Sequence, residues 1–153
     1  MTRLAVLLAL MASLACPARA EGPDRASILL GSHHAAARAA FEGVNPGLFL
    51  TWENRAGLDW SVGAYRNSYG RASVAVTVAR PLIRWRGGEA GVFAGLAHYP
   101  GNGRRFRVSA GDVVPLAGVQ ARHGNLFAQV IPLGGRAARA VATVGVTFDL
   151  GGD

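Results

Sequence analysis

Residues 140–150 read AVATVGVTFDL, and their side chains alternate in character along the chain. An extended strand points successive side chains to opposite faces, so this pattern predicts a strand with two different faces. One face would carry Ala142, Val144, Val146, Phe148 and Leu150. The other would carry Val141, Thr143, Gly145, Thr147 and Asp149. The first face is continuously apolar, whereas the second is mostly small, hydroxylated or acidic.

The same alternation recurs along the chain, for example in LDWSVGAY at 58–65 and SVAVTVA at 73–79, with turn residues between the alternating segments. No stretch after residue 20 offers the roughly 18 consecutive apolar residues of a membrane-spanning helix. Pro81, Pro115 and Pro132 fall in or beside three of the segments, which argues against central strands of a soluble sheet. We predict eight strands, at about 26–36, 46–54, 57–67, 72–85, 89–99, 111–122, 125–132 and 137–150.

The connections between these segments are of two kinds, and the two kinds interleave. Residues 54–57, 86–89 and 122–125 are tight and polar, and the other connections are mostly longer or less regular. Short turns at one end and longer loops at the other are typical of bacterial outer-membrane barrels. We therefore predict an all-β fold, an eight-stranded antiparallel up-and-down transmembrane β-barrel over residues 21–153. Aromatic residues near the strand ends would form its interfacial girdles, namely Trp52, Trp60, Trp85, Tyr99 and Phe148.

The alternative is a secreted soluble β-barrel or sandwich in which the apolar face forms the core. Its outer face would then consist of Ser, Gly, Ala and Thr in a chain that is only 16% charged, which is unusual for a soluble protein. The sixteen basic residues are all Arg and are scattered singly, a distribution that argues against a nucleic-acid-binding surface. The single Cys excludes a disulfide scaffold.

Residues 1–20 have the features of a secretory signal peptide. A positive start at Met1-Thr2-Arg3 precedes an apolar run from Leu4 to Ala15, and Ala18-Arg19-Ala20 fits the cleavage rule. A membrane anchor is the alternative, but the apolar run is too short to span. Cys16 raises lipidation as a second alternative. Cleavage after Ala20 would leave 14 Arg against 9 acidic residues, a net charge of +5, in a protein exported to the outer membrane of a Gram-negative bacterium.

Three groups of residues could take part in chemistry. In Ser32-His33-His34, alternation places one His on each face, so the pair is unsuited to binding a metal, although either His could act as a general base. Ser68, in the turn between the third and fourth strands, would lie at the same end of the barrel, where a His could activate its hydroxyl for acyl transfer. The acidic residues Glu53, Asp59 and Glu89 are interpreted as lumenal partners of Arg or as solvated turn residues.

The order of four segments resembles the lipid A palmitoyltransferases, the PagP-like outer-membrane barrels of eight strands. The first segment is the His pair followed by FEGVNPGL at 41–48, and the second is VGAYRNSY at 62–69. The others are GVFAGL at 91–96 and VVPLAGV at 113–119, which runs on to VIP at 130–132. The likeness covers about residues 30–150.

The resemblance implies an enzyme that moves a palmitoyl chain from a phospholipid to lipid A without a cofactor. It places a catalytic Ser at Ser68 and a catalytic His at His33 or His34, of which we prefer His34 because it lies nearer the rim. Asn67 holds the position of the family's Asp and could orient the other two residues, although it carries no charge to stabilise an imidazolium. Small inward residues would leave space for the acyl chain, and we name Gly63, Ala75 and Gly95 as substrate-binding candidates.

One further departure from the family concerns the start of the mature chain. Better-known members carry an amphipathic helix before the first strand, whereas only about five residues separate Glu21 from the strand here. We expect membrane phospholipid and lipid A as the binding partners of a monomer that uses neither metal nor cofactor and binds no nucleic acid. Two alternatives remain open: a lipid A deacylase with water as the acceptor, and a non-catalytic small barrel with a lipid-binding or structural role.

Overall fold

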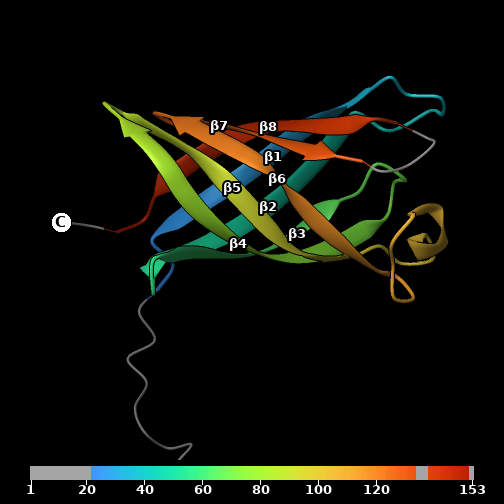
Figure 1. Ribbon diagram of the computed structural model, residues 1–153, viewed down its shortest axis with the longest axis horizontal. Helices are drawn as coiled ribbons and strands as arrows, with labels where there is room; N and C mark the ends of the chain where they lie inside the picture. The colour runs from blue at the N-terminus through green and yellow to red at the C-terminus, as the bar shows by residue number, and fades with distance from the viewer. Residues whose placement is uncertain (1–21, 134–137, 152–153) are drawn as a thin grey trace, which may run out of the picture.

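In the computed structural model, which describes residues 22–133 and 138–151, eight antiparallel strands form one closed barrel (Figure 1). Each strand pairs with the next along the chain, and β1 pairs with β8. The predicted eight-stranded antiparallel up-and-down β-barrel is confirmed, while the predicted signal peptide lies outside the described residues. The strands are β1 Arg25–Ala35, β2 Val44–Arg55, β3 Leu58–Arg66, β4 Ala72–Trp85, β5 Gly88–His98, β6 Val113–His123, β7 Leu126–Pro132 and β8 Ala140–Asp149, with a 3-10 turn, η1, at Gly103–Arg105.

The two ends of the barrel differ in the length of their connections. Two-residue turns at 56–57, 86–87 and 124–125 lie at the left of Figure 1, and each contains a Gly with positive φ. Such Gly residues allow the tight turns that match the twist of antiparallel strands. Loops 36–43, 67–71 and 99–112 lie at the right, at the end we call the mouth. Among the described residues, no helix is long and apolar enough to cross a membrane.

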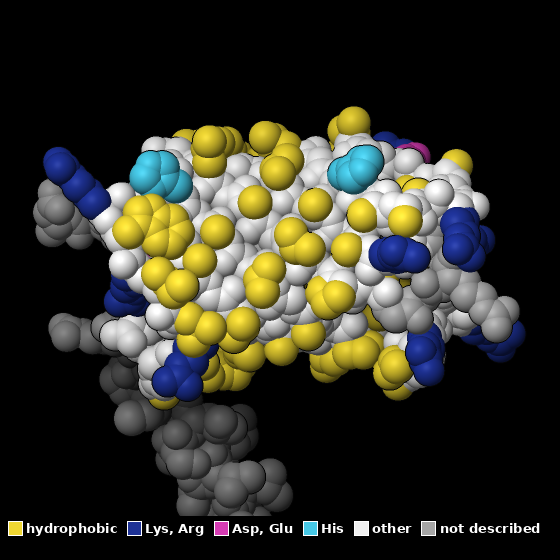
Figure 2. Space-filling model, turned by 45° about the horizontal axis from the view of Figure 1, so that its top comes forward, with side chains coloured by type: hydrophobic (Ala, Val, Ile, Leu, Met, Phe, Trp, Pro, Cys, Tyr) yellow, Lys and Arg dark blue, Asp and Glu magenta, His cyan; other side chains and the backbone are white. Residues whose placement is uncertain are grey.

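The outer surface of the barrel is apolar on every strand. Figure 2 shows hydrophobic side chains spread over the middle of the barrel wall and Arg side chains gathered toward its ends. One exposed example from each strand in turn is Ile28, Leu48, Val62, Val76, Leu96, Val119, Val130 and Val144. The buried set, by contrast, includes Arg25, Thr51, Asp59, Ser73, Glu89, Thr143 and Thr147. The apolar face predicted from the alternation is therefore the outside of the barrel, and the lumen carries the polar face.

Large aromatic side chains gather around the outside at the short-turn end. Trp52 and Trp60 are direct cross-strand partners on β2 and β3. Trp85 and Phe148 are exposed near the ends of β4 and β8. Tyr99 differs from the prediction, because its side chain turns inward and lines the interior cavity.

A β-bulge in β1 decides which His faces the lumen. The register of β1 against both β2 and β8 shifts between Leu29 and Gly31. Because side chains alternate with a period of two, one extra residue exchanges the two faces for the rest of the strand. After the bulge His34 lines the interior cavity, whereas His33 is exposed. The sequence favoured His34 only for its nearness to the rim, and the bulge is what turns this residue inward.

The prolines within strands lie where the sheet is irregular. Pro81 borders a register shift between β4 and β5. Strand β6 pairs with β5 along its whole length, but its pairing with β7 is confined to Val119–His123. Pro115 and Pro132 therefore lie near the mouth, where β6 and β7 do not pair with each other. A residue without an N–H group is tolerated at such an edge.

A substitution at Gly95 tests how closely β4 and β5 must approach each other. A Cβ at this position would overlap the carbonyl oxygen of Val76 and lie 2.7 Å from the Cα of Thr77, both backbone atoms that cannot move aside. We expect Gly95→Val to lower the free energy of unfolding by about 1–3 kcal/mol, as overpacking does elsewhere. Urea-induced unfolding of the refolded barrel measures this.

The matched control for Gly95→Val is Ala94→Val, on the adjacent, outward-facing and exposed residue. It should change the free energy of unfolding by no more than about 0.5 kcal/mol. Equal destabilisation by the two variants would contradict the inward packing of Gly95.

Candidate functional site

The barrel encloses a cavity of about 450 Å³, within the size range of small-molecule binding sites. It extends from charged residues at the short-turn end to the loops at the mouth. Inward side chains from all eight strands line it. An eight-stranded barrel is narrow, so its interior has room for little more than one slender ligand. The apolar part of the wall is formed by Leu29, Phe49, Ala75, Phe93, Val114, Leu116, Phe127, Ile131, Leu133, Ala138 and Val141.

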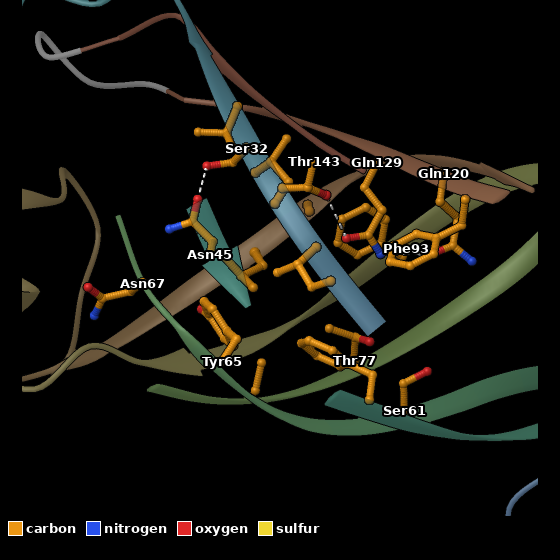
Figure 3. Close-up of a pocket in the computed structure, with 18 of the residues that line it drawn as sticks. Ser32, Asn45, Ser61, Tyr65, Asn67, Thr77, Phe93, Gln120, Gln129 and Thr143 are labelled. Atoms are coloured by element: carbon orange, nitrogen blue, oxygen red, sulfur yellow. Dashed lines mark hydrogen bonds between the residues drawn. The ribbon is translucent and has the colours of Figure 1, made fainter. Parts of the chain in front are cut away.

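Polar side chains on the wall bind one another. Thr143 Oγ1 donates to Gln129 Oε1 at 3.4 Å (Figure 3). Gln129 Nε2 in turn donates to Gln120 Oε1 at 3.2 Å. The hydroxyl groups of Thr51 and Ser61 are 2.8 Å apart in a further hydrogen bond. Pairing of this kind removes much of the cost of burying polar groups. The remaining surface that the lumen offers to a ligand is largely apolar.

A charged floor fills the short-turn end of the lumen and consists of Arg25, Glu53, Glu89 and Arg122. Arg25 forms an ion pair with Glu53, and its Nη1 lies 3.9 Å from Glu89 Oε1. Arg122 Nε donates to Glu89 Oε1 at 3.0 Å, and Arg122 Nη2 lies 3.6 Å from Glu53 Oε1. Arg25 and Glu89 are buried, so the cavity ends at this network. Glu53 and Glu89 are thus partners of Arg, one of the two interpretations from the sequence.

Asp59, the third acidic residue considered from the sequence, also points inward and is buried. Its Oδ1 accepts a hydrogen bond from the backbone N–H of Asn54 at 2.9 Å, at the turn that joins β2 to β3. This contact assigns the carboxylate a role in shaping the turn.

His34 lies at the mouth and is held by aromatic contacts. Its imidazole stacks on the Phe41 ring with a centroid distance of 4.0 Å and an interplanar angle of 5°. Phe41 in turn packs against Tyr69 at 5.8 Å. Ser68, beside Tyr69, lines the same cavity as His34, and its backbone oxygen accepts the N–H of Glu42 at 3.1 Å. The end of β1 and loop 67–71 therefore place the two predicted catalytic residues at the same mouth.

The Asn67 side chain is buried and holds the 67–71 turn together. Its Oδ1 accepts the backbone N–H groups of Tyr69 at 2.9 Å and Arg71 at 3.2 Å. Its Nδ2 donates to Ser73 Oγ at 2.9 Å. Asn and Asp commonly organise turns by binding nearby backbone N–H groups in this way. Asn67 thus supports the loop that carries Ser68, through hydrogen bonds made to its own turn and to β4.

The three small residues named as substrate-binding candidates have different surroundings. Ala75 is part of the cavity wall. A Cβ at Gly63 would overlap the ring of Phe49, so the space at this position is filled by that ring. Gly95 instead allows the close approach of β4 described above. Of the three, Ala75 is the residue placed to touch a bound chain.

Sequence reasoning did not single out the pair formed by Ser32 and Asn45. Ser32 shares the inward face of β1 with His34, and its Oγ donates to Asn45 Oδ1 (Figure 3). Asn45 Nδ2 donates to the backbone oxygen of Arg66 at 3.2 Å, which ties β2 to the end of β3. The inward placement of Ser32 follows from the bulge in β1, a feature without a local sequence signal.

Among the described residues, no group of three or more His, Cys, Asp or Glu side chains is placed to hold a metal ion.

Replacing Glu89 tests the charged floor. Glu89→Gln removes the buried carboxylate that accepts a hydrogen bond from Arg122 and leaves Arg25 and Arg122 to share Glu53, with the exposed Asp149 as a further partner of Arg122. We expect a loss of about 3 kcal/mol in the free energy of unfolding. Glu42→Gln is the matched control, because it breaks the exposed ion pair between Glu42 and Arg66 (2.9 Å) at the mouth. The control should cost less than about 1 kcal/mol. Equal losses in urea-induced unfolding would mean that the floor contributes no more than a surface pair.

Comparison of the chain with models of protein families and with curated proteins finds no match. The resemblance to lipid A palmitoyltransferases therefore stays a prediction, and the evidence for the candidate site is the geometry described above.

Proposed function

We propose that this protein lies in the outer membrane of a Gram-negative bacterium and transfers a palmitoyl chain from a phospholipid to lipid A. The observation that carries the proposal is the lumen, an apolar-walled cavity of about 450 Å³ that ends at a charged floor and has His34 and Ser68 at its mouth. In this proposal residues 1–20 are the signal peptide that directs export.

Membrane insertion is supported by the barrel's outer face and by its closure. Exposed apolar side chains surround the barrel on all eight strands. A hydrocarbon environment requires every backbone polar group to be satisfied within the protein, and a closed barrel meets that requirement wherever neighbouring strands pair. The turns and loops at the two ends would then lie in the two aqueous compartments.

Binding of an acyl chain is supported by the composition of the cavity wall. Leu29, Phe93 and Phe127 line its depth, while the polar wall residues are hydrogen-bonded to one another. The interrupted pairing between β6 and β7 near the mouth offers a route by which a membrane lipid would reach the cavity, past Leu116 and Ile131 on its wall.

The proposed reaction is an ester exchange. Ser68 Oγ attacks the ester carbonyl carbon of the phospholipid while His34 accepts the hydroxyl proton. The ester C–O bond breaks, and the leaving lysophospholipid oxygen takes that proton from His34. A lipid A hydroxyl then attacks acyl-Ser68 and gives its proton to His34, which returns it to Ser68 Oγ as the new ester leaves.

A second candidate is a barrel that binds a lipid without transforming it. The buried Asn67 amide favours this candidate. Its hydrogen bonds go to Tyr69, Arg71 and Ser73, and an amide supplies no negative charge to stabilise a His34 imidazolium. The apolar lumen serves both candidates equally. Analysis of lipid A separates them.

Membrane insertion can be tested with Val76→Arg, on the outer face of β4. An Arg near the bilayer midplane costs about 2–4 kcal/mol, so we expect a loss of that size when unfolding is measured in phospholipid vesicles. The matched control is Val108→Arg, on an exposed residue of loop 99–112, with an expected change within about 0.5 kcal/mol. A neutral Val76→Arg variant, or recovery of the protein in the soluble periplasmic fraction, would rule out membrane insertion.

Acyl transfer can be tested by expressing the chain in an outer membrane and analysing lipid A by mass spectrometry. We expect lipid A to gain one palmitoyl mass, and Ser68→Ala or His34→Ala to abolish that gain because each removes a reacting group. Ser109→Ala, on an exposed loop residue, is the matched control and should keep it.

The other outcomes of this experiment are equally informative. Loss of one acyl chain from lipid A would identify a deacylase, with water in place of the lipid A hydroxyl. Loss of activity in Ser32→Ala but not in Ser68→Ala would move the nucleophile to β1. Unchanged lipid A, with the barrel folded, would leave the lipid-binding candidate.

A further inference from the structure

The mouth carries a large excess of positive charge. Among the described residues, its exposed basic side chains are Arg38, Arg66, Arg71, Arg104, Arg105, Arg107 and Arg139. Its described acidic residues are Glu42 and Asp112, since the others lie at or near the short-turn end.

Both of these acidic residues are already engaged. Glu42 Oε1 accepts a hydrogen bond from Arg66 Nη2 at 2.9 Å. Asp112 accepts the backbone N–H groups of Gly101 at 2.7 Å and Gly103 at 3.1 Å, and these bonds hold the pKa of the Asp112 carboxyl below its usual value. Asp112 therefore stays ionised, and its two hydrogen bonds stabilise the conformation of loop 99–112. Both carboxylates thus already accept hydrogen bonds from groups of the protein.

Two of the arginines stand at the entrance to the cavity without an acidic partner among the described residues. Arg105 and Arg107 both line the cavity. The Arg105 guanidinium lies over the Tyr69 ring, 4.9 Å from its centroid. Tyr69 is fixed in turn by Phe41 at 5.8 Å and by Phe106 at 6.3 Å. A guanidinium that lies over a ring face keeps its own N–H donors, which point outward in the guanidinium plane, available for an anion.

These observations combine a cationic entrance with an apolar interior. We infer that the mouth selects an amphiphile whose headgroup is a net-negative phosphate, bound by Arg105 and Arg107 while the alkyl chain lies in the lumen. The inference rests on the proposed function for the occupant of the lumen and adds the charge of that occupant's headgroup. A zwitterionic headgroup is disfavoured, because the two carboxylates of the described mouth already accept hydrogen bonds from the protein and Arg105 covers the Tyr69 ring that could otherwise bind an ammonium.

The test compares two probes with the same C16 chain, hexadecyl phosphate and hexadecylphosphocholine. Binding to the folded barrel is measured by isothermal titration calorimetry in micelles of an uncharged maltoside detergent, with protein-free micelles as the blank. We expect hexadecyl phosphate to bind about tenfold more tightly, the usual effect of hydrogen bonds between charged groups. The preference should shrink as salt is added, because the entrance is exposed.

Variants separate a local site from the overall charge. The double variant R105Q/R107Q should weaken hexadecyl phosphate binding about tenfold and leave hexadecylphosphocholine within about twofold. The matched control R80Q/R86Q removes the same charge from exposed positions nearer the other end of the barrel and should leave both affinities unchanged. Circular dichroism checks that each variant is folded.

Several results would overturn the inference. They are equal binding of the two probes by the wild-type protein, binding of neither probe, and equal weakening by the two double variants. Inorganic phosphate alone is the third ligand, and affinity equal to that of hexadecyl phosphate would show an ion site unrelated to the lumen. Because none of these measurements involves acyl transfer, a headgroup preference together with unchanged lipid A would refute the proposed enzyme and retain the site.

Discussion

Pairing of β1 with β8 closes the sheet, and this closure determines the environment of every strand residue. In a closed barrel each side chain faces either the outside or a narrow lumen, and neighbours along a strand take opposite faces. Large apolar side chains such as Val62 and Val76 are accommodated outside. Inside, a ring such as that of Phe49 fits because Gly63 lies beside it. Most polar side chains of the strands thus face the lumen and most of the large apolar ones face outward, the reverse of a protein with an apolar core.

The strands and the turns were predictable because their signals are local. Alternation over 58–65 or 140–150 marks an extended strand without knowledge of its partners, and the Gly residues at 57, 87 and 124 mark the tight turns. The bulge between Leu29 and Gly31 has no such signal, because it depends on how β1 registers with β2 and β8 at once. The sequence could therefore favour one His of the pair, but only the register of the strands establishes which one faces inward. Tyr99 shows the same limit, since an aromatic residue at a strand end can point either way.

The candidate site was predictable only in part, because its contacts join distant segments. Placing Ser68 and a His at one end required only the order of strands and loops. The ion pair between Arg25 and Glu53 and the stacking of His34 on Phe41 depend on the three-dimensional register. The two ends also use their charges differently. The floor pairs the guanidinium groups of Arg25 and Arg122 with carboxylates, whereas the described part of the mouth leaves Arg105 without one. The lumen is therefore charge-paired at its floor and open to an anion at its entrance.

Asn67 connects this asymmetry to the proposed chemistry. Its Oδ1 binds two backbone N–H groups, a function that an Asp could also perform, so the turn itself does not require an amide. The amide instead avoids burying a negative charge at a residue that is 1% exposed. In the proposed reaction His34 would therefore form an imidazolium without help from a carboxylate at this position. In the same proposal the cationic mouth would act on the ester, because positive groups placed near an ester stabilise the oxyanion that develops as Ser68 attacks. The proposed site would then depend less on the basicity of its His than on Arg105 and Arg107, which would both bind the headgroup and stabilise the oxyanion.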